Sequence, residues 1–79
     1  MTPAEAAIAA AQIIGSQAEL ARRLSLAAPT VNQWCSGVRP IPPSRAVQLE
    51  AMTDGKVSRR DLCPTFPWNQ LAALPIHVA

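Results

Sequence analysis

The chain has 79 residues and a formal net charge of +2, and 49% of its residues are hydrophobic although only 4% are aromatic. A chain this short forms one small domain that buries roughly 60% of its unfolded surface, and its aliphatic, alanine-rich composition favours helices. The charge alone does not indicate a nucleic-acid partner. The longest apolar run, residues 6–11, is too short to span a membrane, and without a signal-peptide pattern the expected location is the cytoplasm.

The first predicted helix begins at residues 2–5, which read TPAE. Threonine is a good N-cap, proline suits the first turn, and a glutamate three residues after the cap completes a capping box. We expect this helix to run from Pro3 to about Ile14 and to end at Gly15. The residues expected to form its packing stripe are Ala7, Ile8, Ala11 and Ile14.

Residues 17–37 predict two short helices joined by a tight turn. The first covers about 17–24 and follows Ser16 as an N-cap, with Glu19 completing a second capping box. The second covers about 28–35, and the proline near its start is tolerated because early helix N–H groups lack partners. Two short helices joined in this way are typical of a helix-turn-helix.

Three positions strengthen the helix-turn-helix interpretation. Ala21 is small enough to let the second helix cross closely, Ser25 falls at the sharp turn, and Val31 fits the angle between the helices. The turn favours a left-handed residue, so a serine there costs about 1–2 kcal/mol. The residues expected to form the motif core are Leu20, Ala21, Ser25, Val31 and Trp34.

The second helix of this motif has an uncharged outward face. Val31, Trp34 and Cys35 share its inward, apolar face, whereas the outward residues are small or polar and include two amides. An amide can donate and accept together and so match adenine N6 and N7, although a plain solvated helix is the alternative interpretation. The residues expected to read base edges are Ala28, Pro29, Asn32 and Gln33.

Phosphate contacts are expected on both sides of that helix. Arg39 projects from the following loop and is the first choice, and Gln17 lies at a helix end whose N–H groups favour an anion. Arg22 and Arg23 are explained equally well as complements of the helix dipole, and the arginines at 59–60 are explained better by a solvated turn. The residues expected to contact phosphates are Gln17, Arg22, Arg23, Thr30, Ser36 and Arg39.

The chain beyond the motif predicts two more helices. Three prolines stiffen the connection 37–43, in which Ile41 is expected to be a core anchor. A fourth helix is predicted over 44–53, and a third capping box is expected to open a one-turn helix over 58–62, which ends before Pro64.

The composition changes after residue 64. Residues 65–79 contain several large apolar side chains and no Asp, Glu, Lys or Arg, so we divide the chain into a domain over 1–64 and an apolar, proline-containing tail over 65–79. A short helix is expected from Pro67 to about Leu74. The tail either folds back over the first and fourth helices or forms an exposed surface for a partner.

Catalytic and metal-binding patterns are not found. The two cysteines are far apart, with no C-x-x-C pattern and one distant histidine, so a metal site is not expected and a disulfide is disfavoured. Cys35 is instead expected to be a small core residue. We therefore expect no enzymatic activity, no cofactor and no small-molecule substrate.

Three segments carry a resemblance to a known family: SQAELARRL (16–24), V-x-x-W-x-x-G (31–37) and RPIPPSRAVQLEAMTDGKVSRRDLCP (39–64). In these segments the chain resembles the YdaS/Cro-type repressors of phages and prophages, although Ser25 stands where that family usually has glycine. The resemblance implies an all-α, lambda-repressor-like helix-turn-helix domain of five helices, or six with the tail. It also implies a sequence-specific transcriptional repressor or the antitoxin of a toxin–antitoxin pair.

The expected partner is therefore double-stranded DNA, with helix 28–35 in the major groove. One such helix reads only a few base pairs, so we expect a homodimer on two half-sites about 34 Å apart. The alternative is an interaction module whose main partner is a toxin protein.

Overall fold

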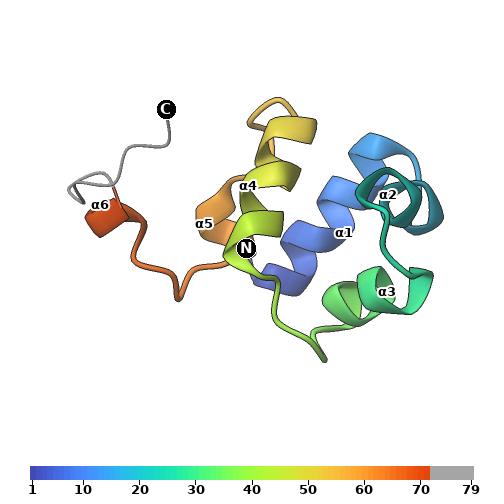
Figure 1. The fold of residues 1–79 in the computed structure, drawn as a ribbon, viewed down its shortest axis with the longest axis horizontal. Helices are drawn as coiled ribbons and strands as arrows, with labels where there is room; N and C mark the ends of the chain where they lie inside the picture. Colours follow the sequence, from blue (N-terminus) through green and yellow to red (C-terminus); the bar gives the residue numbers. More distant parts are fainter. Residues whose placement is uncertain (72–79) are drawn as a thin grey trace.

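The computed structural model describes residues 1–71, and every regular element in this part of the chain is a helix (Figure 1). The helices are α1 (Pro3–Ile14), α2 (Gln17–Leu24), α3 (Ala28–Ser36), α4 (Pro43–Met52), α5 (Arg59–Leu62) and α6 (Trp68–Leu71). The predicted all-α fold is confirmed for these residues. The bounds of α1 and α2 match the prediction, and α3 ends one residue later than expected.

Local capping explains where α1 begins and ends. The Thr2 hydroxyl accepts a hydrogen bond from the Glu5 N–H at 3.1 Å, and the Glu5 carboxylate accepts one from the Thr2 N–H at 2.8 Å. At the other end, Gly15 has a φ of 141° and donates its N–H to the carbonyl of Ala11 at 2.8 Å. Glycine adopts this positive φ at little cost, so the chain can leave the helix here.

The buried face of α1 consists of alanines. Its buried residues are Ala6, Ala7, Ala10 and Ala11. The predicted packing stripe was wrong for Ile8, which is 39% exposed, whereas Ile14 is half-buried against the core. Methyl side chains let helices approach closely, and α1 packs against α2, α3 and α5, so a bulky isoleucine falls at the edge of this face.

The helices form two groups that meet across α1. Helices α2 and α3 pack on each other and on α1, whereas α4 packs on α5 and α5 packs on α1. In Figure 1, α1 lies between the α2–α3 pair and the α4–α5 pair. The large apolar side chains buried in the shared core are Leu20, Val31, Trp34, Leu49 and Leu62. Ile41, in the connection between the groups, is buried as predicted.

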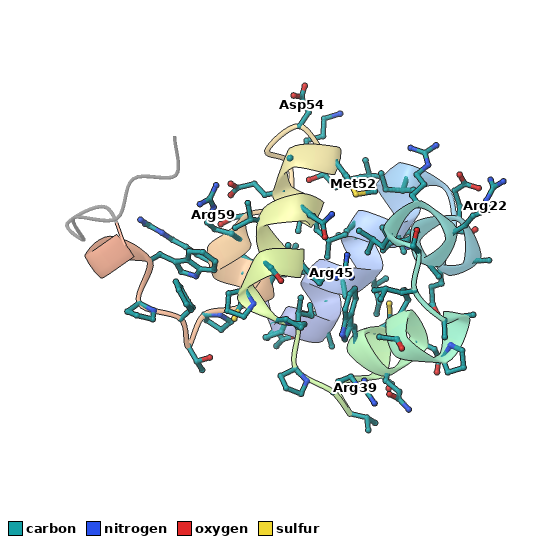
Figure 2. All side chains as sticks on the ribbon, viewed as in Figure 1. Arg22, Arg39, Arg45, Met52, Asp54 and Arg59 are labelled. Atoms are coloured by element: carbon teal, nitrogen blue, oxygen red, sulfur yellow. The ribbon has the colours of Figure 1, made fainter. Side chains whose placement is uncertain are left out.

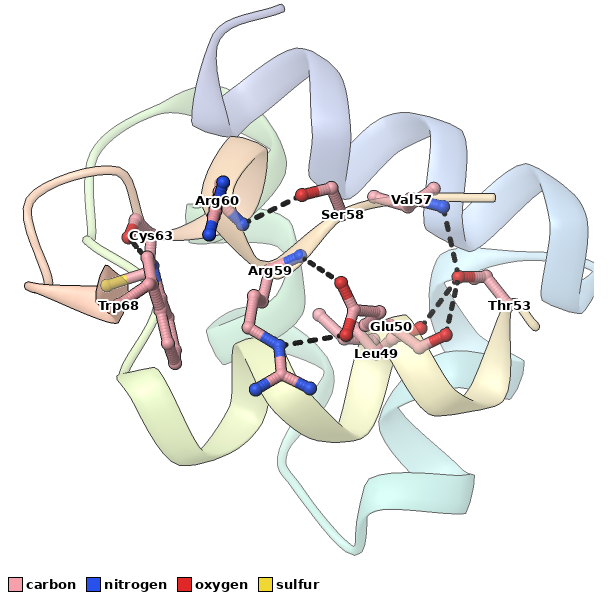
Figure 3. Close-up of polar contacts among 9 residues, drawn as sticks. All are labelled: Leu49, Glu50, Thr53, Val57, Ser58, Arg59, Arg60, Cys63 and Trp68. Carbon is pink, nitrogen blue, oxygen red and sulfur yellow. Dashed lines mark hydrogen bonds and ion pairs between the residues drawn. The ribbon is translucent and has the colours of Figure 1, made fainter. Parts of the chain in front are cut away.

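The start of α5 is capped by a carboxylate from α4 (Figure 3). The Arg59 N–H donates to Glu50 Oε2 at 2.9 Å, and Arg59 Nε donates to Glu50 Oε1 at 2.8 Å. The predicted third capping box was wrong, because the Ser58 hydroxyl accepts from the Arg60 N–H and not from Asp61. Ser58 therefore still caps α5 locally, and a side chain nine residues before Arg59 adds a second cap.

The first residues of the tail fold back onto α5. Phe66 and Trp68 are partly buried against the core, and their rings lie 4.5 Å apart. Trp68 Nε1 donates to the carbonyl of Cys63 at 2.8 Å, and the Arg59 guanidinium lies 5.4 Å from the centre of the Trp68 ring. The helix expected from Pro67 to Leu74 begins at Trp68, and its expected continuation beyond residue 71 lies outside the described residues.

Candidate nucleic-acid interface

A left-handed residue forms the turn between α2 and α3. Ser25 has φ 57° and ψ 40°, the conformation expected for this position. Its N–H donates to the carbonyl of Arg22 at 3.2 Å, and the Leu26 N–H donates to the carbonyl of Ala21 at 2.9 Å. These bonds close the end of α2, so the chain changes direction sharply before α3 begins at Ala28.

The apolar residues of the predicted motif core are buried between the two helices. Ala21 is 3% exposed, Val31 is fully buried and Trp34 is 2% exposed. Leu20 is also buried. Ser25 is exposed, and it contributes to the motif through the left-handed conformation of its backbone. The indole N–H of Trp34 has no hydrogen-bond partner among the described residues. This packing orients the second helix and leaves its outer face uncovered.

The outer face of α3 carries most of the predicted DNA contacts. Pro29, Asn32 and Ser36 are exposed and follow one another at spacings of three and four residues, so they share one face. Ala28 is also exposed, whereas Thr30 and Gln33 are half-buried at the edge of this face.

One hydrogen bond joins this face to the first residue of α2. Asn32 Nδ2 donates to Gln17 Oε1 at 3.3 Å. A predicted base-reading residue and a predicted phosphate-contacting residue are thus brought together. The pairing could not be predicted from the sequence, because fifteen residues separate its members and no local pattern marks it.

The loop after α3 is fixed by the carbonyl of Gln33. This carbonyl accepts from the N–H groups of Val38 and Arg39 at 3.0 and 3.2 Å and from the Ser36 hydroxyl at 3.2 Å. Gly37 makes the turn with a φ of 81°. The Arg39 side chain is exposed, forms no salt bridge within the described part of the chain, and lies at the edge of the molecule beside α3 (Figure 2).

The two arginines of α2 share a carboxylate. Arg23 Nε donates to Glu19 Oε2 at 2.9 Å, and Arg22 pairs with the other oxygen of the same group. Arg23 and then Arg22 lower the pKa of Glu19 below its ordinary value. The second capping box is therefore only half formed: the Ser16 hydroxyl accepts from the Glu19 N–H, but the carboxylate faces the arginines. Glu19 offsets part of the positive charge that these arginines could offer a phosphate.

The two arginines of α5 contact residues of α4 and α6 and not α3. Arg59 pairs with Glu50, and Arg60 Nη2 donates to Asn69 Oδ1 at 3.0 Å. In Figure 2, Arg59 lies on the side of α4 away from α2 and α3. Arg59 is half-buried in this ion pair, where a solvated turn was expected, whereas Arg60 is exposed as expected.

The described residues offer little other site chemistry. Cys35 and Cys63 are buried and unpaired, and burial raises the pKa of the Cys35 thiol. Residues 1–71 contain no group of three histidine, cysteine or acidic side chains that could hold a metal ion. None of the helices in this part of the chain has the length and hydropathy needed to cross a membrane.

Comparisons with known proteins support the sequence resemblance. The family model described as "Bacterial toxin YdaS" matches residues 7–71. The chain is 40% identical over 60 residues to "Regulatory protein cro" of Pseudomonas phage D3, an alignment covering 76% of this chain and 82% of the phage protein. It is also 39% identical over 62 residues to "Putative transcriptional regulator YdaS" of Escherichia coli (strain K12). That alignment covers 78% of this chain and 63%, just under two thirds, of the Escherichia coli protein.

No solved structure matches the chain significantly. The family match nevertheless spans most of the chain, from α1 to the end of α6, and it includes the whole helix-turn-helix. The chain belongs to the YdaS family.

Proposed function

We propose that this protein is a sequence-specific DNA-binding transcriptional regulator, a repressor of the Cro/YdaS type that inserts α3 in the major groove. The observation that carries the proposal is the exposed outer face of α3, where Asn32 is already hydrogen-bonded to Gln17. The names of the two relatives, both regulators, support the regulatory role.

Base reading is assigned to the outer face of α3. Asn32 and Gln33 supply amides that match adenine N6 and N7, and Ala28 and Pro29 supply apolar surface for a thymine methyl. Gln33 is half-buried, so its amide reaches a base only from the edge of this face. A helix without charged side chains suits this task, because its contacts depend on hydrogen-bond pattern and not on charge alone.

Phosphate contacts are assigned to the residues around that face. Arg39 is the leading candidate, because it is exposed and forms no salt bridge among the described residues. Gln17 lies at the start of α2, where backbone N–H groups and the helix dipole favour an anion. The remaining candidates are Arg22, Arg23, Thr30 and Ser36.

The protein is proposed to bind as a homodimer on two half-sites about 34 Å apart, because one α3 reads too few base pairs to select a genomic site. The division into a DNA-binding domain over 1–64 and a tail over 65–79 stays a prediction. Residues of the tail are proposed to form the seam between the two copies.

A fluorescence-anisotropy titration tests the proposal. A labelled duplex from the region upstream of the protein's own gene is compared with a scrambled duplex of the same composition and length. At physiological salt, the upstream duplex is expected to bind about 10³-fold tighter or more. A footprint on this duplex is expected to cover an inverted repeat. Equal affinity for the two duplexes contradicts sequence-specific binding, and protection of a single half-site contradicts the dimer.

The second candidate function is a protein-interaction module, such as an antitoxin whose main partner is a toxin. The aromatic side chains at the start of the tail, Phe66 and Trp68, are only half-buried, and the surface they leave open favours keeping it. The description of the matching family names the family itself as a toxin and supplies no partner. Co-expression with the product of the neighbouring gene, followed by size-exclusion chromatography, tests it. A stable complex combined with no preference for the upstream duplex would favour this function over the first.

A further inference from the structure

The side chain of Arg45 joins the two helix groups by a hydrogen bond. Arg45 on α4 donates from Nη1 to the carbonyl of Leu24, the last residue of α2, at 3.4 Å. Within residues 1–71, no other hydrogen bond or salt bridge connects the chain before residue 41 with the chain after it. Figure 2 places Arg45 between α4 and the α2–α3 pair.

The two groups also share one apolar core. Buried side chains of α1 and α5 and of the connection at Ile41 hold the groups together. Apolar burial is not directional, so it holds two surfaces together without fixing their angle strictly. A hydrogen bond has a preferred direction and therefore restricts that angle, and the Arg45 bond, which at 3.4 Å is longer than the ordinary range of about 2.7–3.2 Å, is a weak restraint of this kind.

The geometry around Arg45 suits a restraint of this kind. The Leu24 carbonyl is one of the last in α2, where helical carbonyls lack intrahelical partners and carry partial negative charge. A guanidinium remains charged at all relevant pH values and complements such a carbonyl. Arg45 is half-buried, and Gln48 Oε1 accepts from the same Nη1 at 2.8 Å, which holds the side chain in place.

We propose that Arg45 is a positioning residue that sets the angle between the DNA-reading pair, α2 and α3, and the pair formed by α4 and α5. Leu24 immediately precedes the left-handed Ser25, so a restraint at its carbonyl acts on the turn that orients α3. If two copies are joined through the tail that follows α4 and α5, this angle sets the distance between their two α3 helices. It therefore sets the half-site spacing at which both α3 helices can bind. This inference rests on the proposed function.

The first test uses the full chain without DNA. Hydrogen exchange measured by NMR is compared between wild type, Arg45→Met and the control Lys56→Met, which removes an exposed cation from the turn after α4. In Arg45→Met, the Ser25 and Leu26 amides are expected to exchange about two- to tenfold faster, the factor that corresponds to one hydrogen bond, while amides of α1 are unchanged. Arg45→Lys, which keeps the charge but not the fork of donors, is expected to be intermediate and serves if the methionine variant folds poorly. Unchanged exchange at the turn overturns the proposal.

The second test measures spacing selectivity. A half-site is selected by the wild-type protein from a randomised duplex library, and two inverted copies are placed at centre-to-centre spacings varied in single steps around 10 bp, about one helical turn. Arg45→Met is expected to narrow the affinity ratio between the best and worst spacing by about two- to tenfold, with single half-site affinity and salt slope unchanged. Lys56→Met is expected to keep the wild-type ratio.

Two results of the spacing experiment would contradict the positioning role of Arg45 or the dimer on which it acts. A salt slope lower by about one in Arg45→Met would make Arg45 a phosphate contact and overturn the positioning role. If the wild type itself shows no spacing preference, the proposed dimer fails and the spacing claim fails with it. The exchange experiment then decides independently whether Arg45 holds the turn.

Discussion

Asn32 on α3 donates a hydrogen bond from its side-chain nitrogen to the side-chain oxygen of Gln17, the first residue of α2, at 3.3 Å. The bond leaves the Gln17 amide nitrogen and the Asn32 amide oxygen without another hydrogen-bond partner among the described residues. Ordering one of these side chains on DNA therefore orders the other. Because preorganised contacts lose less entropy on binding, the pair is expected to act as one unit.

The pairing predicts non-additive effects on DNA binding. Gln17→Ala and Asn32→Ala are each expected to weaken binding to the best site by about 1–3 kcal/mol. The double variant is expected to lose less than the sum, by at least about 0.5 kcal/mol, because either single change already removes the shared bond. A double-mutant cycle by anisotropy at fixed salt measures this coupling. Additive losses would mean that the two amides act independently.

Arg39 is predicted to contact a phosphate. Arg39→Ala is expected to weaken binding to specific and random DNA alike and to lower the salt slope by roughly one. Arg22→Ala is expected to have a smaller effect, because Glu19 already offsets its charge. Affinities measured over a series of salt concentrations, with Lys56→Ala as the control cation, test both variants. An unchanged slope for Arg39→Ala would exclude the phosphate contact.

The Glu50 cap of α5 predicts an acid-sensitive contribution to folding. The Arg59 N–H and then the Arg59 side chain lower the pKa of Glu50 below its ordinary value. The contribution is therefore complete above the ordinary glutamate pKa and is lost as the pH falls through the lowered pKa. Glu50→Gln is expected to lower the free energy of unfolding by about 1 kcal/mol at neutral pH and by less in acid, since the pair is partly exposed. Denaturant melts at several pH values measure this, and a loss that does not shrink in acid would contradict it.

Two truncations separate the parts of the tail. A chain ending at Thr65 loses Phe66 and Trp68, which pack on the core, and is expected to lose about 1–3 kcal/mol of stability. A chain ending at Leu71 keeps both and is expected to melt like the full chain while its solution mass falls from dimer to monomer. Thermal melts and light scattering provide the two readouts. If the chain ending at Leu71 remains a dimer, the seam does not lie in residues 72–79.

The helix bounds could be predicted from the sequence where the stop signals are local. Thr2 and Gly15 bound α1, and Ser16 and Ser25 bound α2, because each cap acts within a few residues of the helix end that it closes. The helix-turn-helix was predictable for the same reason. Its small residue Ala21, its turn residue Ser25 and its apolar residue Val31 are separated by short, fixed distances in the sequence.

Contacts between distant residues could not be predicted in this way. Glu50 caps α5 from another helix, and Glu19 uses its carboxylate on two arginines where a capping box was expected. Ile8 lies outside the packing face of α1, whose buried residues are all alanines, and periodicity alone did not reveal that. The Arg45 contact with α2 also requires the tertiary fold.

The central claim is that the amide-bearing face of α3 reads base edges, and Gln33→Ala tests it most directly. The substitution removes the side-chain amide but keeps the carbonyl that holds the following loop. Binding of wild type and variant is measured by anisotropy on the best site and on random DNA at the same salt concentration. We predict a loss of about 1–3 kcal/mol on the best site and little change on random DNA. An equal loss on both duplexes, or none on either, would contradict the claim.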